Sequence, residues 1–132
     1  MENIKELKTG VYELIEKFSF SVNEFMHYPE SFGNIIFTIQ KDKTLIRFFS
    51  DRGDLYVELG TVERDDEWID FQTMLKILFG YDDKLWRDDI LGFVKHILDI
   101  ESKYHNELQD YCGREKFKQF KETIHNYQMK HQ

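Results

Sequence analysis

The sequence predicts an α+β fold, a small antiparallel sheet packed with helices, and two patterns indicate it. Between residues 19 and 60 the side chains alternate with a period of two and are rich in β-branched and aromatic types, as in strands. Before and after this stretch, apolar residues recur every three or four positions, as in amphipathic helices. We therefore expect a meander of three to four strands, an N-terminal helix and three C-terminal helices in one domain, residues 1–132.

The first helix is expected over the segment whose apolar residues form one stripe: Ile4, Leu7, Val11, Leu14, Ile15 and Phe18. Gly10 lies inside it, and its missing side chain would let another element approach closely. The period then changes to two, so residues 19–23 are expected to form a short edge strand. Pro29 is excluded from a central strand and marks a loop leading into the sheet.

The turn at Arg52-Gly53 determines the register of the sheet, because a two-residue loop pairs Asp51 with Asp54. Counting back pairs Ser50 with Leu55, Phe49 with Tyr56, Phe48 with Val57, Arg47 with Glu58 and Ile46 with Leu59. The preceding loop, at residues 41–44, aligns Ile39 with Ile46, Phe37 with Phe48 and Thr38 with Arg47.

This register gives the sheet two different faces. The core face carries Ile35, Phe37, Ile39, Ile46, Phe48, Leu55, Val57 and Leu59. The second face carries Ile36, Thr38, Leu45, Arg47, Phe49, Tyr56 and Glu58. A slip of one residue would bury Arg47 and Glu58, so the pattern specifies the pairing. Because several apolar helices need docking sites, the simplest expectation is that a terminal helix covers the second face.

Helices are expected in the rest of the chain. Asp65 or Asp66 would cap a helix that begins near Glu67, buries Trp68 and ends at Gly80. Asp82 or Asp83 would cap a long helix whose stripe runs from Trp86 to Tyr111 and which ends at Gly113. A last helix, with Phe117, Phe120, Ile124 and Tyr127, would return along it as the second arm of a helical hairpin.

The charge of the chain bears on its partners. The net charge is −7, and residues 63–89 hold nine acids against four bases. This argues against nucleic acid or an anionic membrane as the main partner, and favours a basic protein. No apolar run is long enough to span a bilayer, the first residues do not resemble a signal peptide, and the single Cys112 fits a reducing compartment. We therefore expect a soluble, cytoplasmic protein.

The sequence contains no recognisable catalytic pattern. His96 and Asp99 are spaced to share a helix face, but no third ligand accompanies them. Cys112 has no identifiable histidine partner, so a buried structural thiol is the expectation. No phosphate-binding loop or nucleophile motif occurs. The prediction is a protein that is not an enzyme and uses no cofactor and no metal.

The candidate partner-binding residues form two groups. The acidic segment contributes Asp65, Asp66, Glu67, Trp68, Asp82, Asp83, Asp88 and Asp89, and the second sheet face contributes Arg47, Phe49, Tyr56 and Glu58. Aromatic residues beside charged ones are typical of interface anchors. For the acidic doublets, helix caps and a solvated surface are the simpler interpretation.

One resemblance joins these motifs. The run Phe32-Gly33-Asn34-Ile35-Ile36-Phe37, the stretch Ile46 to Glu58 with its Asp51-Arg52-Gly53 turn, and Trp68 with Leu75 resemble small bacterial immunity proteins of polymorphic toxin systems. The resemblance covers roughly residues 30–80 and transfers no individual binding residue. It implies a cytoplasmic, non-enzymatic protein that binds and neutralises a toxin domain, often a nuclease.

Two alternatives remain open. One is a small-molecule-binding or enzymatic domain with a pocket between sheet and helices, which a deep cavity holding His27, His96 or His105 beside a carboxylate would favour. The other is a structural or oligomerisation role for the C-terminal helical hairpin, which a dimer burying the stripe from Trp86 to Tyr111 would favour.

Overall fold

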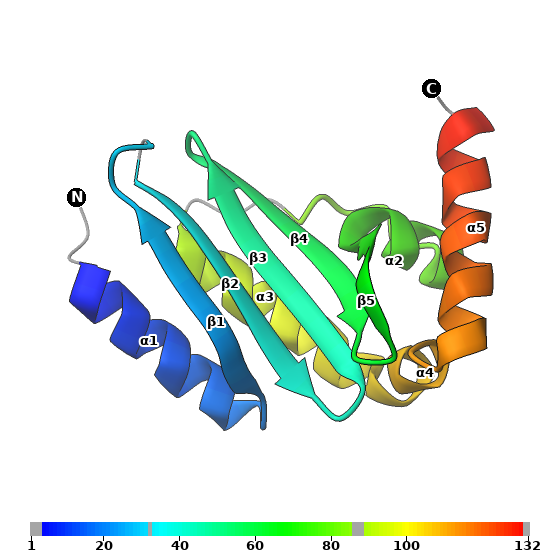
Figure 1. Cartoon of the computed structure of the whole chain (residues 1–132), viewed down its shortest axis with the longest axis horizontal. Helices are drawn as coiled ribbons and strands as arrows, with labels where there is room; N and C mark the ends of the chain where they lie inside the picture. The colour runs from blue at the N-terminus through cyan, green and yellow to red at the C-terminus, as the bar shows by residue number, and fades with distance from the viewer. Residues whose placement is uncertain (1–3, 32, 86–88, 131–132) are drawn as a thin grey trace.

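The computed structural model of the chain describes residues 4–31, 33–85 and 89–130. The elements, in chain order, are α1 (Ile4–Lys17), β1 (Ser21–Tyr28), β2 (Asn34–Lys41), β3 (Thr44–Asp51), β4 (Asp54–Thr61), β5 (Arg64–Asp70), α2 (Phe71–Phe79), α3 (Ile90–Lys103), α4 (His105–Tyr111) and α5 (Arg114–Lys130) (Figure 1). The predicted α+β class is confirmed, with five strands in place of three or four. None of the described helices is long and apolar enough to cross a membrane.

The sheet is an antiparallel meander in the order β1-β2-β3-β4-β5. The register predicted for β2, β3 and β4 is confirmed at every pair that the sequence assigned. Arg52 and Gly53 have φ angles of 54° and 90°, the positive values that a tight two-residue hairpin turn requires. The turn and the period-two pattern therefore specify the same pairing.

The core lies between one face of the sheet and the helices, with α1 and α3 packed along that face and α2, α4 and α5 adding buried residues at its β5 end. The predicted core-face residues are buried, except Leu55, which is half-buried. α3 runs behind the strands in Figure 1, and its Phe93 packs edge-on against Phe48 at a centroid distance of 6.0 Å. α1 packs beside α3, where a Cβ at Gly10 would lie 3.1 Å from Leu91. The close approach expected at Gly10 is confirmed.

Two predictions about the strands need correction. β1 extends to Tyr28, well past the expected end at residue 23. Residues 64–70 form β5, and the helix expected near Glu67 begins at Phe71. Asp70 is its cap, because its carboxylate accepts a hydrogen bond from the Thr73 N–H at 2.9 Å. Pairing with β4 outweighs the local helical signal of the acidic segment, since it buries Ile69 in the core.

The prediction of one long C-terminal helix is also wrong in detail. Asp89, rather than Asp82 or Asp83, caps α3 by accepting from the Gly92 N–H at 2.9 Å, and Trp86 lies outside the described residues. The helix breaks at Tyr104, so α3 and α4 are separate. α5 packs against α4, α2 and β5 and stands at one end of the sheet (Figure 1), so its hairpin is formed with the short α4.

Candidate functional site

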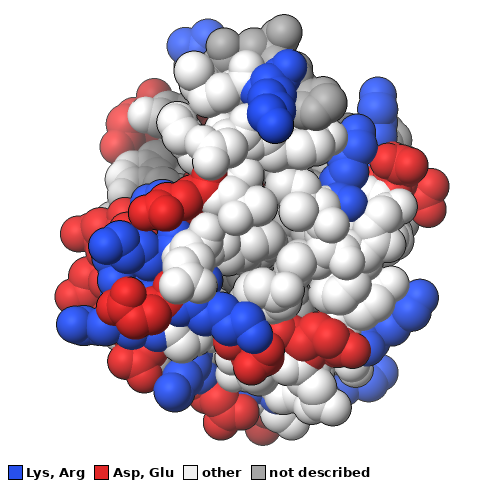
Figure 2. All heavy atoms as spheres, turned by 90° about the vertical axis from the view of Figure 1, so that its right-hand side faces the viewer, with Lys and Arg blue, Asp and Glu red and all other residues white. Residues whose placement is uncertain are grey.

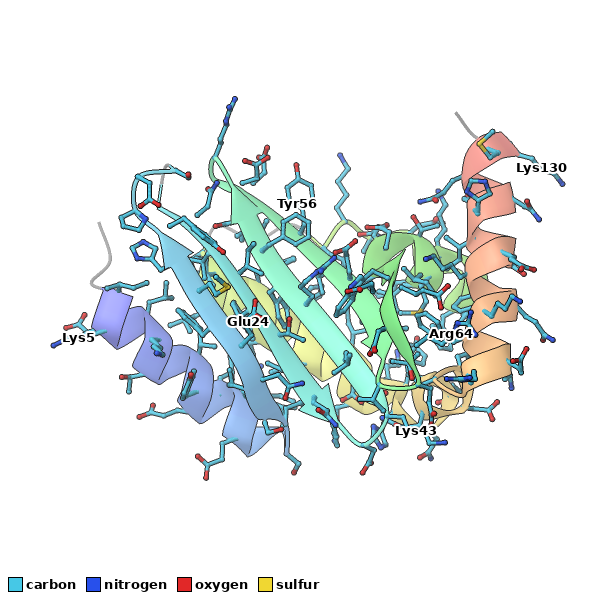
Figure 3. All side chains as sticks on the ribbon, viewed as in Figure 1. Lys5, Glu24, Lys43, Tyr56, Arg64 and Lys130 are labelled. Atoms are coloured by element: carbon cyan, nitrogen blue, oxygen red, sulfur yellow. The ribbon has the colours of Figure 1, made fainter. Side chains whose placement is uncertain are left out.

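The open sheet face is the side of the sheet opposite α1 and α3. We expected a terminal helix to cover it, but no described helix crosses it (Figure 1). α1 and α3 both pack on the core face, and α5 docks at the β5 end. Glu24 and Tyr56 project from the open sheet face (Figure 3). The prediction that a helix covers this face is wrong, because the apolar helices already bury their stripes elsewhere.

An apolar row crosses the open sheet face. The register aligns one residue from each of four strands: Met26, Ile36, Phe49 and Tyr56. Phe49 and Tyr56 stack with their ring centroids 5.0 Å apart. Met26 is 39% exposed and Tyr56 43%, so the ends of the row remain in contact with water. Large apolar groups left in contact with water on a folded surface are typical of binding surfaces when they lie together.

Beside the apolar row, Arg47 joins Glu58 and Trp68 into one unit. Its Nε donates to Glu58 Oε1 at 3.0 Å, and its guanidinium lies 4.1 Å from the centre of the Trp68 ring. The ring covers Gly60, where a Cβ would lie 2.8 Å away. These contacts hold Trp68 in place, because cation–π and charge-assisted contacts combine. The fold thus brings together five candidate residues, adding Phe49 and Tyr56 to this unit.

The remaining candidates are dispersed. Asp65 and Asp66 are exposed on β5. Glu67 faces the helices instead and forms ion pairs with Arg64 and with Lys121 of α5. The hydrogen bond from Arg64 holds the pKa of the Glu67 carboxyl below its usual value. This carboxylate is already neutralised within the chain.

The later acidic candidates serve local roles. Asp82 lies 3.9 Å from Lys76, and the backbone carbonyl of Asp83 accepts from Gln72. Asp89 is the α3 cap, and Asp88 lies outside the described residues. Acidic and basic groups are interspersed on the α5 side of the molecule (Figure 2). The described acidic candidates therefore do not assemble into one patch. The cap interpretation holds for Asp89 alone, whereas Asp65, Asp66, Asp82 and Asp83 are exposed surface residues that cap no described helix.

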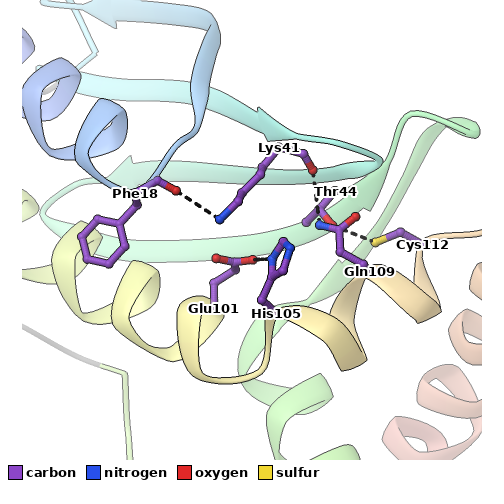
Figure 4. Close-up of polar contacts among 7 residues, drawn as sticks. All are labelled: Phe18, Lys41, Thr44, Glu101, His105, Gln109 and Cys112. Carbon is purple, nitrogen blue, oxygen red and sulfur yellow. Dashed lines mark hydrogen bonds and ion pairs between the residues drawn. The ribbon is translucent and has the colours of Figure 1, made fainter.

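A second cluster of polar groups is buried where α3 meets α4 (Figure 4). Glu101 is fully buried, and its Oε1 lies 2.6 Å from His105 Nδ1. Its Oε2 has no hydrogen-bond partner among the described residues. His96 and Asp99, whose spacing suggested a shared helix face, contact Tyr81 and Lys95 instead. The i,i+4 spacing of Glu101 and His105 was the signal that could have found the pair.

The thiol of Cys112 completes this region. Its Sγ lies 3.3 Å from Thr44 Oγ1, which also accepts from Gln109 Nε2 at 2.6 Å (Figure 4). Cys112 is fully buried, as expected of a structural thiol. Burial raises its pKa to about 11, so the thiol is protonated at neutral pH and a poor nucleophile. Among the described residues, no three His, Cys, Asp or Glu side chains are placed to hold a metal ion.

Comparisons with known proteins give no match for this chain. No protein-family model, curated protein or solved structure matches the chain.

The cavity enclosed between the sheet and α3 is too small for a ligand. A cavity beside Phe48 and Phe93 has about 10 Å³ of free volume, whereas ligand pockets span roughly 300–1,000 Å³. His105 does lie beside a carboxylate, but Glu101 is packed in the interior. The open sheet face, with its apolar row and the Arg47–Glu58–Trp68 unit, is the better candidate for a functional site.

Proposed function

We propose that this chain is a non-enzymatic binding module that docks a basic protein on its open sheet face. The observation that carries the proposal is the apolar row, which four strands align on a face that no described helix covers. A row of this kind supplies aromatic anchors at the centre of an interface. The Arg47–Glu58–Trp68 unit beside it is already ordered, so binding would cost little side-chain entropy there.

The distribution of charge supports a basic partner. Residues 21–70, which make up the sheet, hold eleven acidic and five basic residues, a net −6 of the total −7. Several of these acids, including Glu24, Asp51 and Asp54, are exposed around the apolar row. Complementary fields raise the rate of encounter between proteins and disfavour acidic competitors.

The resemblance to immunity proteins extends the proposal to a biological role. In this role the chain resides in the bacterial cytoplasm and occludes a toxin domain. A nuclease is the first candidate, because a nuclease needs a basic surface to bind phosphates. Nucleic acid and membranes are not partners in this proposal, and no cofactor is involved.

The oligomerisation alternative receives no support from the packing. Among the described residues of the predicted stripe, Phe93, Ile97, Ile100 and Leu108 are buried within one chain, and Ile90, Tyr104 and Tyr111 are half-buried. The buried residues are therefore not free to form a seam between two copies.

A toxicity assay tests the proposed function. The reading frame adjacent to this gene is identified, its C-terminal domain is expressed in bacteria, and co-expression of this chain is expected to restore growth. Tyr56→Asp should abolish the rescue by placing a charge in the apolar row. Tyr12→Asp is the matched control: Tyr12 is 41% exposed, close to the 43% of Tyr56, and each contacts one Phe ring. Rescue that is equally sensitive to both changes, or no toxic neighbour, would refute the proposal.

A further inference from the structure

Half of β4 has no described strand paired with it on one side. β5 pairs with β4 only as far as Glu58 opposite Asp70, and the chain then leaves the sheet to begin α2. Residues 54–57 therefore have β3 on one side and no described strand on the other (Figure 1). Among the described strands, this half of β4 is therefore a free strand edge, at the opposite side of the sheet from the outer strand β1.

The hairpin register determines which backbone groups face this opening. Asp51 and Asp54 close a two-residue turn, so Asp54, Tyr56 and Glu58 exchange their backbone hydrogen bonds with β3. The residues between them alternate in direction. Leu55 therefore directs its N–H and C=O, and Val57 its N–H, away from β3 and toward the opening.

A groove follows this edge. Residues 55–57 line it, Leu85 and Phe93 contribute apolar surface, and Asp70 and Gln72 contribute polar groups. We call this groove, together with the free edge of β4, the edge notch. It is continuous with the apolar row, because Tyr56 belongs to both. It combines backbone donors and acceptors with an apolar lining, the two features that an added strand uses.

We propose that the edge notch takes an extended segment of the basic partner as an added strand, in the place that β5 leaves empty. This inference rests on the proposed function. The backbone edge selects an extended chain over a helix, and the apolar lining selects an apolar side chain. Asp54 and Asp70 are exposed carboxylates at the two ends of the edge, so they favour Lys or Arg flanking that apolar residue.

Hydrogen exchange of the free protein tests the geometry first. The amides of Leu55 and Val57 should exchange on the order of a hundredfold faster than those of Tyr56 and Glu58, which are bonded to β3. If Leu55 exchanges as slowly as Tyr56, the edge is already paired and the proposal is overturned.

A phage library of random 12-residue peptides tests the ligand. Selected peptides should place an apolar residue between Lys or Arg and should slow the exchange of Leu55 and Val57. N-methylation of a single peptide amide that faces β4 should weaken binding about tenfold, because it removes one backbone hydrogen bond. Peptides that bind without protecting these amides, or a selection without binders, would overturn the proposal.

Two variants of one residue separate the backbone from the side chain. Leu55→Pro removes the N–H that faces the notch and keeps three side-chain carbons, whereas Leu55→Ala removes more of the side chain and keeps the N–H. Peptide affinity should fall about tenfold further in Leu55→Pro than in Leu55→Ala, and equal affinities would contradict the added strand. If Leu55→Pro does not fold, the N-methylated peptides decide. If rescue from the toxin fails in Tyr56→Asp but persists in Leu55→Pro, the added strand is refuted and the proposed function still stands.

Discussion

Replacing His105 with Ala should destabilise the fold, because it removes the hydrogen-bond partner of the buried Glu101 carboxylate. Glu101 is fully buried, His105 Nδ1 at 2.6 Å is the partner of Oε1, and Oε2 has no partner among the described residues. Removing one partner of a buried pair typically costs about 3–5 kcal/mol. The His105 side chain is 29% exposed, so water can enter its place and we expect about 2–4 kcal/mol.

The double variant Glu101→Leu with His105→Ala should be more stable than His105→Ala alone. An apolar side chain leaves no unpaired group inside, and such replacements of buried pairs are often neutral or stabilising. Urea unfolding followed by circular dichroism measures both free energies. The expected difference is about 2 kcal/mol, well above the uncertainty of the extrapolation for a domain of this size.

The control for this series lies on the same helix. Lys95 and Asp99 have the same i,i+4 spacing, 2.8 Å between Nζ and Oδ2, but their side chains are 58% and 50% exposed. Lys95→Ala should therefore cost less than about 1 kcal/mol. If His105→Ala costs no more than Lys95→Ala, or if the double variant is the least stable, the account of the buried pair is refuted.

Three further changes test the packing and the caps. Burial raises the pKa of Cys112 from 9.0 to about 11, so its contribution to stability is intact below pH 9 and falls as the pH rises from 9 to 11, by up to about 3 kcal/mol. Cys112→Ala should lack this component in urea titrations at alkaline pH, and an unchanged alkaline slope would contradict it. Gly60→Ala places a Cβ 2.8 Å from the Trp68 ring and should lower stability by about 1–3 kcal/mol in thermal unfolding, but much less in a Trp68→Ala background. Asp70→Ala removes the α2 cap and should cost about 1 kcal/mol by chemical denaturation, whereas the exposed Asp65→Ala should cost under about 0.5; equal losses would mean that Asp70 is no cap.

The central hairpins were predictable because their signals are local. A two-residue turn at Arg52-Gly53 and a strict alternation of side chains both act within a few residues, and a slip would bury Arg47. The α1 stripe was predictable for the same reason, since its period identifies the buried face.

The errors lie where distant contacts decide. Arg64–Asp70 carries acids that resemble the start of a helix, but β4 offers these residues a strand partner. Trp68 then packs over Gly60, a contact that the sequence alone does not signal. The break at Tyr104 falls within an unbroken apolar stripe.

The candidate site also combines features that the sequence predicted with features that only the tertiary structure determined. Arg47, Phe49, Tyr56 and Glu58 were placed together from the sequence, because strand period and turn length are local properties. Three features depended on tertiary structure: the uncovered face, the gap beside β4 and the burial of Glu101. Each depends on where a helix or strand docks after it forms, and docking is decided by competition among apolar surfaces that lie far apart in the chain.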